Sequence, residues 1–279
     1  MTHESNPAVT FHRTCEGHLA ARLDGYAMIA FPAQDGHLSV WSGFIIDLPP
    51  EQWVRDDFFI AGTTVADEDE FQAHAIEYAA HISERRTLPR INIRSGYSTP
   101  WGMADDTRRY GDGVLFHSSP SHGGFELSVE ANAKVHPALR NADRFYEEDI
   151  DWAKVTDTFP DLFTAYERKQ AYLTLRNWEP DAYEQVHGLV LQPGQSQGKD
   201  KERFEVEHAN DWVVITTMTL RGSPRMLECL ASLGGKRQVT HFKRFLIPAD
   251  EYRPGPFGFV IDENRHAVSD RADRLHPER

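Results

Sequence analysis

Apolar segments rich in branched and aromatic residues predict β-structure in the first quarter of the chain. Branched and aromatic residues are concentrated at positions 27–31 and 38–47, and Gln34-Asp35-Gly36 lies between them. Such side chains favour strands, and the sequence Asp-Gly favours a tight turn. The two segments are therefore expected to form a β-hairpin.

Helical spacing follows this hairpin. Apolar residues recur three or four positions apart between Phe71 and Ile82. The four acids at 67–70 come just before them, where negative charge favours the N-terminus of a helix. We expect this helix to end near Arg85 and Arg86, before the next proline.

The middle of the chain combines short strands with helices. Glycines and prolines at 95–102 and 119–124 indicate loops, so Gly123 and Gly124 are expected in a turn. The expected elements are strands at 91–94, 113–118 and 125–128 and helices at 147–159, 160–178 and 180–187.

The last third is expected to be rich in strands. Residues 192–201 are polar and contain no core positions, which is typical of a linker. Beyond it we expect strands at 203–208, 212–220, 240–247 and 257–261 and a helix at 224–233.

Together these patterns predict an α+β fold, in which antiparallel β-hairpins pack with a helical middle region and a second β-rich layer. The expected parts are an N-terminal region 1–98, a middle region 99–191, a linker loop 192–202, a β-rich region 203–262 and a polar tail 263–279, within one compact domain overall.

Composition and charge narrow the classes of function. The chain of 279 residues is 40% hydrophobic and 26% charged, a globular balance. Its net charge of −13 disfavours direct binding to nucleic acid. The sequence has no apolar run of about 20 residues and no secretion signal at its start, so no membrane association is expected. Cys15 and Cys229 are expected to be free thiols in a reducing cytoplasm.

The acidic excess is concentrated in two stretches. The first has eight acids against Arg55: Asp47, Glu51, Asp56, Asp57, Asp67, Glu68, Asp69 and Glu70. The second lies between Asp143 and Asp161. We hypothesise that Asp56, Asp57, Asp67, Glu68, Asp69 and Glu70 form an acidic face for a protein partner, one version of which imitates the phosphates of DNA. The alternative is an ordinary solvated surface.

The strongest candidate site joins the loop 119–124 to residues 146–149. Paired glycines let a backbone approach a ligand closely, and the imidazole of His122 is suited to be a general base or a metal ligand. Carboxylates on one helical turn would orient that imidazole or share a cation. We assign catalysis to His122, Glu147 and Glu148, binding to Trp101, Ser121, Gly123, Gly124, Tyr146 and Asp149, and metal ligation to His122 and Glu148. The alternative is that the glycines serve a hairpin bulge and the acids only complement a helix dipole.

Other motifs give little support for a catalytic or metal site. His12, Cys15 and His18 recur every three residues, but no second pair follows at zinc-finger spacing. His74, Glu77 and His81 fit one side of a helix without the order found in zinc proteases. The chain has no phosphate loop, Rossmann fingerprint or nucleophile elbow, so no nucleotide cofactor is expected. The identity of any cofactor stays open, and a divalent metal is one candidate.

Three segments resemble a known family. They are Thr99-Pro100-Trp101-Gly102, Ser119-Pro120-Ser121-His122-Gly123-Gly124-Phe125 and Tyr146-Glu147-Glu148-Asp149. They resemble a bacterial family catalogued as a domain of unknown function and associated with plasmids and prophages, and the similarity extends over residues 99–262. The resemblance implies a bacterial cytoplasmic protein with an accessory role for a mobile element, and it brings no catalytic residues with it.

Two functions therefore remain open at the level of sequence. The first is an accessory protein of a plasmid or phage that binds a protein partner through an acidic face, with an anti-defence or antirestriction role. The second is a hydrolase-like or metal-assisted enzyme centred on His122 and the Glu147, Glu148 and Asp149 cluster. The second requires His122 and at least one of these carboxylates to converge within a few ångströms on one cleft.

Overall fold

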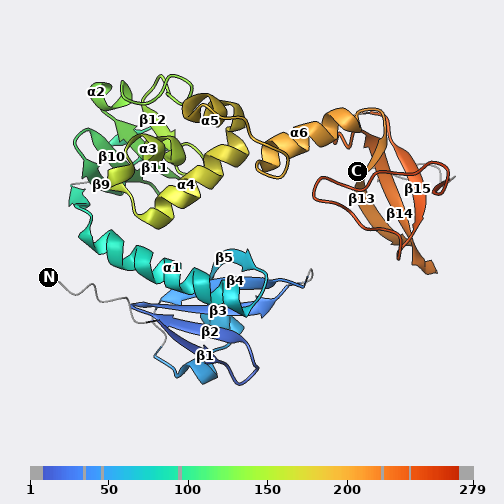
Figure 1. Cartoon of the computed structure of the whole chain (residues 1–279), viewed down its shortest axis with the longest axis horizontal. Helices are drawn as coiled ribbons and strands as arrows, with labels where there is room; N and C mark the ends of the chain where they lie inside the picture. Colours follow the sequence, from blue (N-terminus) through green and yellow to red (C-terminus); the bar gives the residue numbers. More distant parts are fainter. Residues whose placement is uncertain are drawn as a thin grey trace. The chain divides into compact units, whose positions relative to one another are not determined.

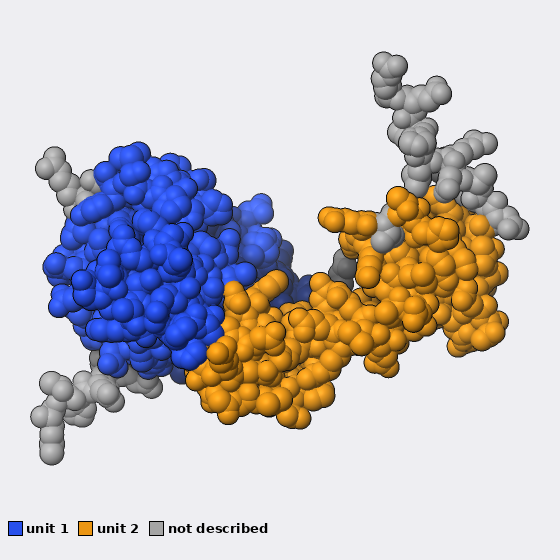
Figure 2. Space-filling view, turned by 90° about the horizontal axis from the view of Figure 1, so that it is seen from above, with its two compact units in different colours: residues 1–175 blue, residues 176–279 orange. Residues whose placement is uncertain are grey.

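The computed structural model describes residues 9–33, 36–44, 47–93, 96–220, 223–238 and 240–269. Helices and antiparallel sheets make up these residues, which confirms the α+β prediction. The chain divides into two compact units, residues 1–175 and 176–279 (Figure 2).

The N-terminal sheet is a five-stranded antiparallel meander covered on one face by α1 (Figure 1). Its strands lie side by side in chain order: β1 (Thr10–Arg13), β2 (Leu19–Leu23), β3 (Tyr26–Pro32), β4 (Leu38–Phe44) and β5 (Ile60–Val65). The pairing of β3 with β4 confirms the predicted hairpin. Gln34 and Asp35 of its turn lie outside the described residues.

Side chains that alternate along the strands give this sheet two apolar faces. One face packs on α1 (Glu68–Thr87), and the other on the segment between β4 and β5 that contains the short 3-10 turns η1 (Pro50–Gln52) and η2 (Arg55–Asp57). The α1 face buries Leu19, Ala21, Leu23 and Met28 against Phe71, Ala75, Ala79 and Ile82, and the opposite face buries Ala20, Ala27 and Ile29 against Trp53 and Phe58.

Helix α1 begins and ends as its sequence predicts. The Asp67 side chain accepts a hydrogen bond from the backbone N–H of Glu70 at 3.0 Å, which caps the first turn. The last turn carries Arg85 and Arg86, whose positive charge complements the C-terminal end of the helix dipole.

A second antiparallel sheet, the middle sheet, follows in the order β12-β11-β10-β9-β6. Its strands are β6 (Ile91–Ile93), β9 (Asp106–Gly111), β10 (Val114–Ser118), β11 (Gly123–Leu127) and β12 (Phe145–Glu147), and the small hairpin β7 (Ser98–Thr99) and β8 (Gly102–Met103) lies between β6 and β9 in the chain. The accompanying helices are α2 (Val129–Asn132), α3 (Trp152–Thr158), the 3-10 turn η3 (Pro160–Leu162) and α4 (Ala165–Trp178).

Three predictions for this region are wrong in detail. Gly123 and Gly124 lie in β11 and not in the turn, because their backbones pair with β10 and β12. Glu147 ends β12, and the helix predicted from 147 begins only at Trp152. Pro160 opens η3 instead of a long helix, since α4 starts at Ala165.

A half-buried ion pair fixes the start of α4. The Arg90 guanidinium donates to both carboxylate oxygens of Glu167, at 3.0 and 2.6 Å, and lies 4.3 Å from the centre of the Tyr110 ring. Thr164 and Glu167 also cap each other, because each side chain accepts a hydrogen bond from the other residue's backbone N–H. This exchange is a capping box, which satisfies two N–H groups that the helix itself cannot.

The hydroxyl of buried Thr164 also lies 2.7 Å from Nδ1 of His81 on α1. Burial lowers the pKa of His81, and Arg85 and Arg90 lower it further, while Glu167 opposes them. A neutral imidazole can accept the Thr164 hydroxyl hydrogen at Nδ1. The contact thus joins α1 to the first turn of α4 through an uncharged histidine.

This histidine is expected to weaken the fold as the pH falls. In the unfolded chain His81 takes up a proton near its ordinary pKa of 6.5, whereas in the folded chain it does so only at lower pH. Below pH 6.5 the unfolded state therefore binds more protons, and the free energy of unfolding falls. Urea denaturation at pH values from about 7.5 to about 5.5 should show a shallower decline for His81→Asn than for the wild type. Equal slopes would contradict this role.

The second unit contains two helices and a four-stranded antiparallel sheet in the order β13-β14-β15-β16. Its elements are α5 (Pro180–His187), α6 (Gln197–Glu207), β13 (Trp212–Leu220), β14 (Ser223–Leu233), β15 (Lys243–Pro248) and β16 (Ala267–Val268). Helix α5 stops at Gly188, which has the left-handed conformation expected of a C-terminal glycine. The core of the sheet contains Cys229, and burial raises the pKa of its thiol to about 11.

Four segments of the second unit differ from their predictions. The predicted linker 192–201 becomes helical from Gln197, because Ser196 caps α6 by accepting from the backbone N–H of Lys199. Residues 203–208 continue that helix, and β13 pairs instead with β14, which had been predicted as a helix at 224–233. Residues 257–261 contribute only isolated bridges in place of a strand.

Among the described residues, no helix is long and apolar enough to cross a bilayer.

Candidate functional site

The register of the middle sheet gathers the predicted site at one end of the sheet. Ser118 pairs with Asp106 on one side and with Gly123 on the other, and the backbone N–H of Glu148 donates to the carbonyl of Gly123 at 3.0 Å. The backbone N–H of Asp105 donates to the carbonyl of Ser118. Residues far apart in the chain thus form one row across four strands.

Trp101 lies directly on Gly124. A Cβ atom at position 124 would come within 2.4 Å of Cη2 of the Trp101 ring and 2.3 Å of the Tyr146 carbonyl oxygen. The same indole meets the Phe145 ring edge-on, with 5.9 Å between centroids. Gly124 is therefore needed for the close approach of a side chain and a strand, and Trp101 covers this part of the sheet as a wall.

His122 ends a tight turn between β10 and β11. The backbone N–H and the hydroxyl of Ser119 both donate to the carbonyl of His122, at 2.8 and 2.6 Å. Pro120 and Ser121 form the tip of this turn, and Ser121 is exposed. This geometry holds the backbone of His122 in place and leaves its ring in solvent.

His122 and Glu148 are brought together. Nδ1 of His122 lies 3.8 Å from Oε1 of Glu148, and the two side chains are 56% and 41% exposed. This distance is too long for a hydrogen bond but allows attraction when the imidazole is protonated. The separation satisfies the distance that the enzyme hypothesis requires, but both side chains lie in open solvent and not in a shared cleft.

The other acids of the cluster have different surroundings. The carboxylate of Glu147 accepts the backbone N–H groups of Asp149, Ile150 and Asp151. It therefore closes the turn that precedes α3, a capping role, and its oxygens do not face His122. Asp149 is exposed on that turn.

Tyr146 belongs to the core. Its side chain is fully buried, and its hydroxyl donates to Oδ1 of Asn132 at 2.5 Å and accepts from the backbone N–H of Asn141. Burial raises the pKa of this phenol, so it stays protonated as a donor. Tyr146 holds the segment 132–141 against β12 and does not reach the His122 surface.

One polar network was not predicted from the sequence. His117 on β10 is 1% exposed, and its Nδ1 lies 2.9 Å from the Thr107 hydroxyl on β9 while its Nε2 lies 3.1 Å from Oε2 of Glu126 on β11. The Tyr97 ring packs 5.2 Å from the imidazole. Only the strand register brings these side chains together, so no local pattern of residues could have identified the network. The network ties three strands together beneath the segment that carries Trp101.

Comparison with protein families matches this region. Residues 94–209 match the model of a family described as a domain of unknown function, DUF7007. We call residues 94–209 the DUF7007 segment. The match contains every residue of the predicted site from Trp101 to Asp149, and it ends at residue 209, whereas the resemblance extended to residue 262. No curated protein and no solved structure matches the chain.

The described residues do not form a cluster of metal ligands around His122 and Glu148. Across the described ranges, no three His, Cys, Asp or Glu side chains come together as they would around an ion. The predicted pair of His122 and Glu148 therefore offers two ligands at most. The two histidines of the His12, Cys15 and His18 motif contact different carboxylates. His12 lies 3.7 Å from Glu51, whereas His18 contacts Glu16.

The N-terminal acids lie outside the DUF7007 segment, in two groups. Asp56 and Asp57 belong to η2, on the face of the sheet opposite α1, whereas residues 67–70 form the cap and first turn of α1. Both groups adjoin β5 in the chain, one before it and one after it. The predicted acidic face is thus divided between two layers.

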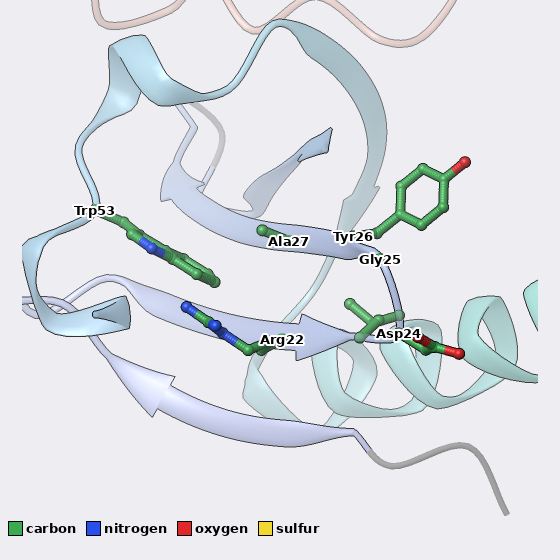
Figure 3. Close-up of a pocket in the computed structure, with 7 residues that line it drawn as sticks. Arg22, Asp24, Gly25, Tyr26, Ala27 and Trp53 are labelled. Atoms are coloured by element: carbon green, nitrogen blue, oxygen red, sulfur yellow. The ribbon is translucent and has the colours of Figure 1, made fainter. Parts of the chain in front are cut away.

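The N-terminal sheet also has a small cavity of about 220 Å³ beside Arg22 and Trp53 (Figure 3). Both side chains donate to the carbonyl of Leu48, at 2.8 and 3.0 Å. The Arg22 guanidinium lies 5.4 Å from the centre of the Trp53 ring. These contacts anchor the segment after β4 to the sheet, which gives the cavity lining a structural role.

Proposed function

We propose that the chain acts by binding a protein partner, and that the partner contacts the end of the middle sheet. The sheet-end surface, as we name it, consists of Trp101, Asp105, Asp106, His122, Glu148 and Asp149. The observation that supports the proposal is the strand register, which brings the backbone segments that carry these residues to one end of the sheet, beside an exposed turn.

The chemistry of the sheet-end surface favours a partner with a basic surface. It contains four carboxylates, and the nearby Arg108 lies 3.7 Å from Asp106. Opposite charge would steer such a partner toward this chain, whose net charge is −13. Tryptophan is enriched among the residues that contribute most to protein interfaces, and Trp101 stands beside the acids.

A role for a bacterial mobile element is the biological part of the proposal. It rests on the resemblance to the plasmid- and prophage-associated family, and a cytoplasmic location agrees with two free thiols. A partner with a basic surface is compatible with an anti-defence role, since nucleic-acid-binding defence proteins have such surfaces.

Reversing charge on the sheet-end surface is expected to abolish partner capture. The variant Asp105→Lys with Glu148→Lys should lose the proteins that the immobilised wild type retains from bacterial lysate, most clearly at low salt. The matched control is Glu202→Lys with Glu205→Lys, which makes the same charge change on exposed positions of α6. Proteins would be identified by mass spectrometry and folding checked by circular dichroism. Retention of the same proteins by all three chains would refute this site.

The contact between His122 and Glu148 favours one second candidate, a hydrolase-like enzyme. In that reading Glu148 orients the imidazole and His122 acts as a general base. Turnover of simple ester or phosphoester substrates that His122→Ala abolishes, with folding unchanged, would favour the enzyme. The open position of both side chains is the reason that binding ranks first, because general-base catalysis gains from excluding water.

A further inference from the structure

The N-terminal sheet has two edges with different chemistry. β1 carries His12 and Arg13, and charges of this kind discourage other strands from pairing with an edge. β5 at the other edge reads Ile-Ala-Gly-Thr-Thr-Val and contains no charged residue. Its first five residues are exposed, and within the described part of the chain β4 is the strand it pairs with. The outer edge of β5 is therefore suited to pair with another strand.

Exposed apolar side chains adjoin the start of β5. Phe44 is 58% exposed and Phe59 63%, and their rings pack together with 5.8 Å between centroids. Ile60, the first residue of β5, is 41% exposed. Apolar surface next to a free strand edge is characteristic of peptide recognition, where backbone hydrogen bonds supply affinity and neighbouring side chains supply specificity.

Acids flank the same strand at both ends. Asp56 and Asp57 precede Ile60 by three or four positions, and residues 67–70 begin two positions after Val65. A strand that paired along β5 would have its central residues beside uncharged side chains and one end near Asp56 and Asp57. Its other end would lie by the first turn of α1, where Asp69 is exposed and Glu68 pairs with Arg13 of β1. This charge pattern predicts the charges that the binding segment should carry.

We propose that β5 accepts an extended segment of a partner protein by strand addition, and that this segment has an uncharged, β-branched centre with basic residues at both ends. The added strand hydrogen-bonds to the outer edge of β5, and an apolar side chain near its end packs on Phe44 and Phe59. The site lies outside the DUF7007 segment and is independent of the sheet-end surface.

Charge argues against a second copy of this chain as the occupant. In an antiparallel pairing of two β5 strands, the acids before one strand come opposite the acids after the other. In a parallel pairing, each acidic group meets its own counterpart. Both arrangements bring like charges together at both ends, which is unfavourable.

Synthetic peptides test the proposal with the full-length chain. The probe has six alternating threonine and valine residues flanked by two arginines at each end. One comparison peptide has glutamates in place of the arginines, and another keeps the arginines but has every central amide N-methylated, so that it cannot donate hydrogen bonds. We expect the first peptide to bind at least about tenfold more tightly than either comparison peptide, in fluorescence anisotropy at low salt.

Hydrogen exchange locates the binding. The arginine-flanked peptide should slow amide exchange within residues 60–65 and leave the β1 segment unchanged. Asp56→Asn with Asp69→Asn should weaken its binding about fivefold, whereas Glu202→Gln with Glu205→Gln on α6 should leave it unchanged. These outcomes do not depend on the capture experiment.

Three results would overturn the proposal. The first is equal binding of the arginine-flanked and N-methylated peptides, which would mean attraction by charge without strand pairing. The second is exchange protection that does not include residues 60–65. The third is a dimer in light scattering that protects β5 without any peptide, which would assign the edge to a second copy.

Discussion

Replacing Arg90 by Met is expected to lower the free energy of unfolding by about 3 kcal/mol. The guanidinium is 6% exposed, donates to both oxygens of Glu167 and lies over Tyr110. Burial raises the pKa of Glu167, but hydrogen bonds from Arg90 and from the Thr164 backbone outweigh it, so the net pKa is lowered. Without Arg90 the Glu167 carboxylate would remain partly buried and would lose the hydrogen bonds that offset the cost of burying its charge. Urea denaturation measures the resulting loss of stability.

Lys169→Met provides the matched control. Lys169 also pairs with a glutamate, Glu77, at 2.7 Å, but the lysine side chain is 55% exposed. Exposed pairs contribute about 0 to 1 kcal/mol, so this change should have a small effect. Equal losses in the two variants would show that the Arg90 pair is no more than a surface contact.

Gly124→Ala is expected to destabilise the middle sheet by about 3 kcal/mol. The added methyl group would approach the Tyr146 carbonyl and the Trp101 ring to distances that real Cβ atoms do not adopt. Either the pairing of β11 with β12 must open or Trp101 must leave the sheet. Thermal unfolding and the intrinsic fluorescence of the folded state would report the two consequences.

Gly255→Ala controls for the loss of a glycine as such. There the added Cβ would meet Gly258 O at an ordinary 3.6 Å. We expect its effect on stability to be within about 0.5 kcal/mol. A Gly124→Ala chain as stable as the wild type would mean that Trp101 is not held on the sheet as the structure shows.

Elements with strong local signals were predictable. Asp67 with its following acids marked the start of α1, and Pro180 and Gly188 marked the two ends of α5. These residues act on their own backbone neighbours, so no knowledge of the rest of the fold is needed.

Elements decided by distant contacts were not predictable. The sequence of β14 includes Met, Leu, Glu and Ala, which favour helices, yet it lies between β13 and β15 with Cys229 and Ala231 fully buried. Tertiary pairing overrides its local preference.

The candidate site also has parts that were predictable and parts that were not. His122 and Glu148 were predicted together and lie 3.8 Å apart. The helix expected to carry Glu147 starts later, at Trp152, because the Glu147 carboxylate closes the preceding turn. The network of His117, Thr107 and Glu126 depended on a register that a single sequence does not reveal.

The helix-forming composition of β14 bears on how the C-terminal sheet assembles. A segment that prefers a helix by itself remains a strand only while neighbours occupy both of its edges. We therefore expect the β13–β14 hairpin to be a poor folding nucleus, which persists only once β15 is in place. Formation of this sheet is accordingly cooperative, with its strands gained or lost together and not added one by one as the chain emerges.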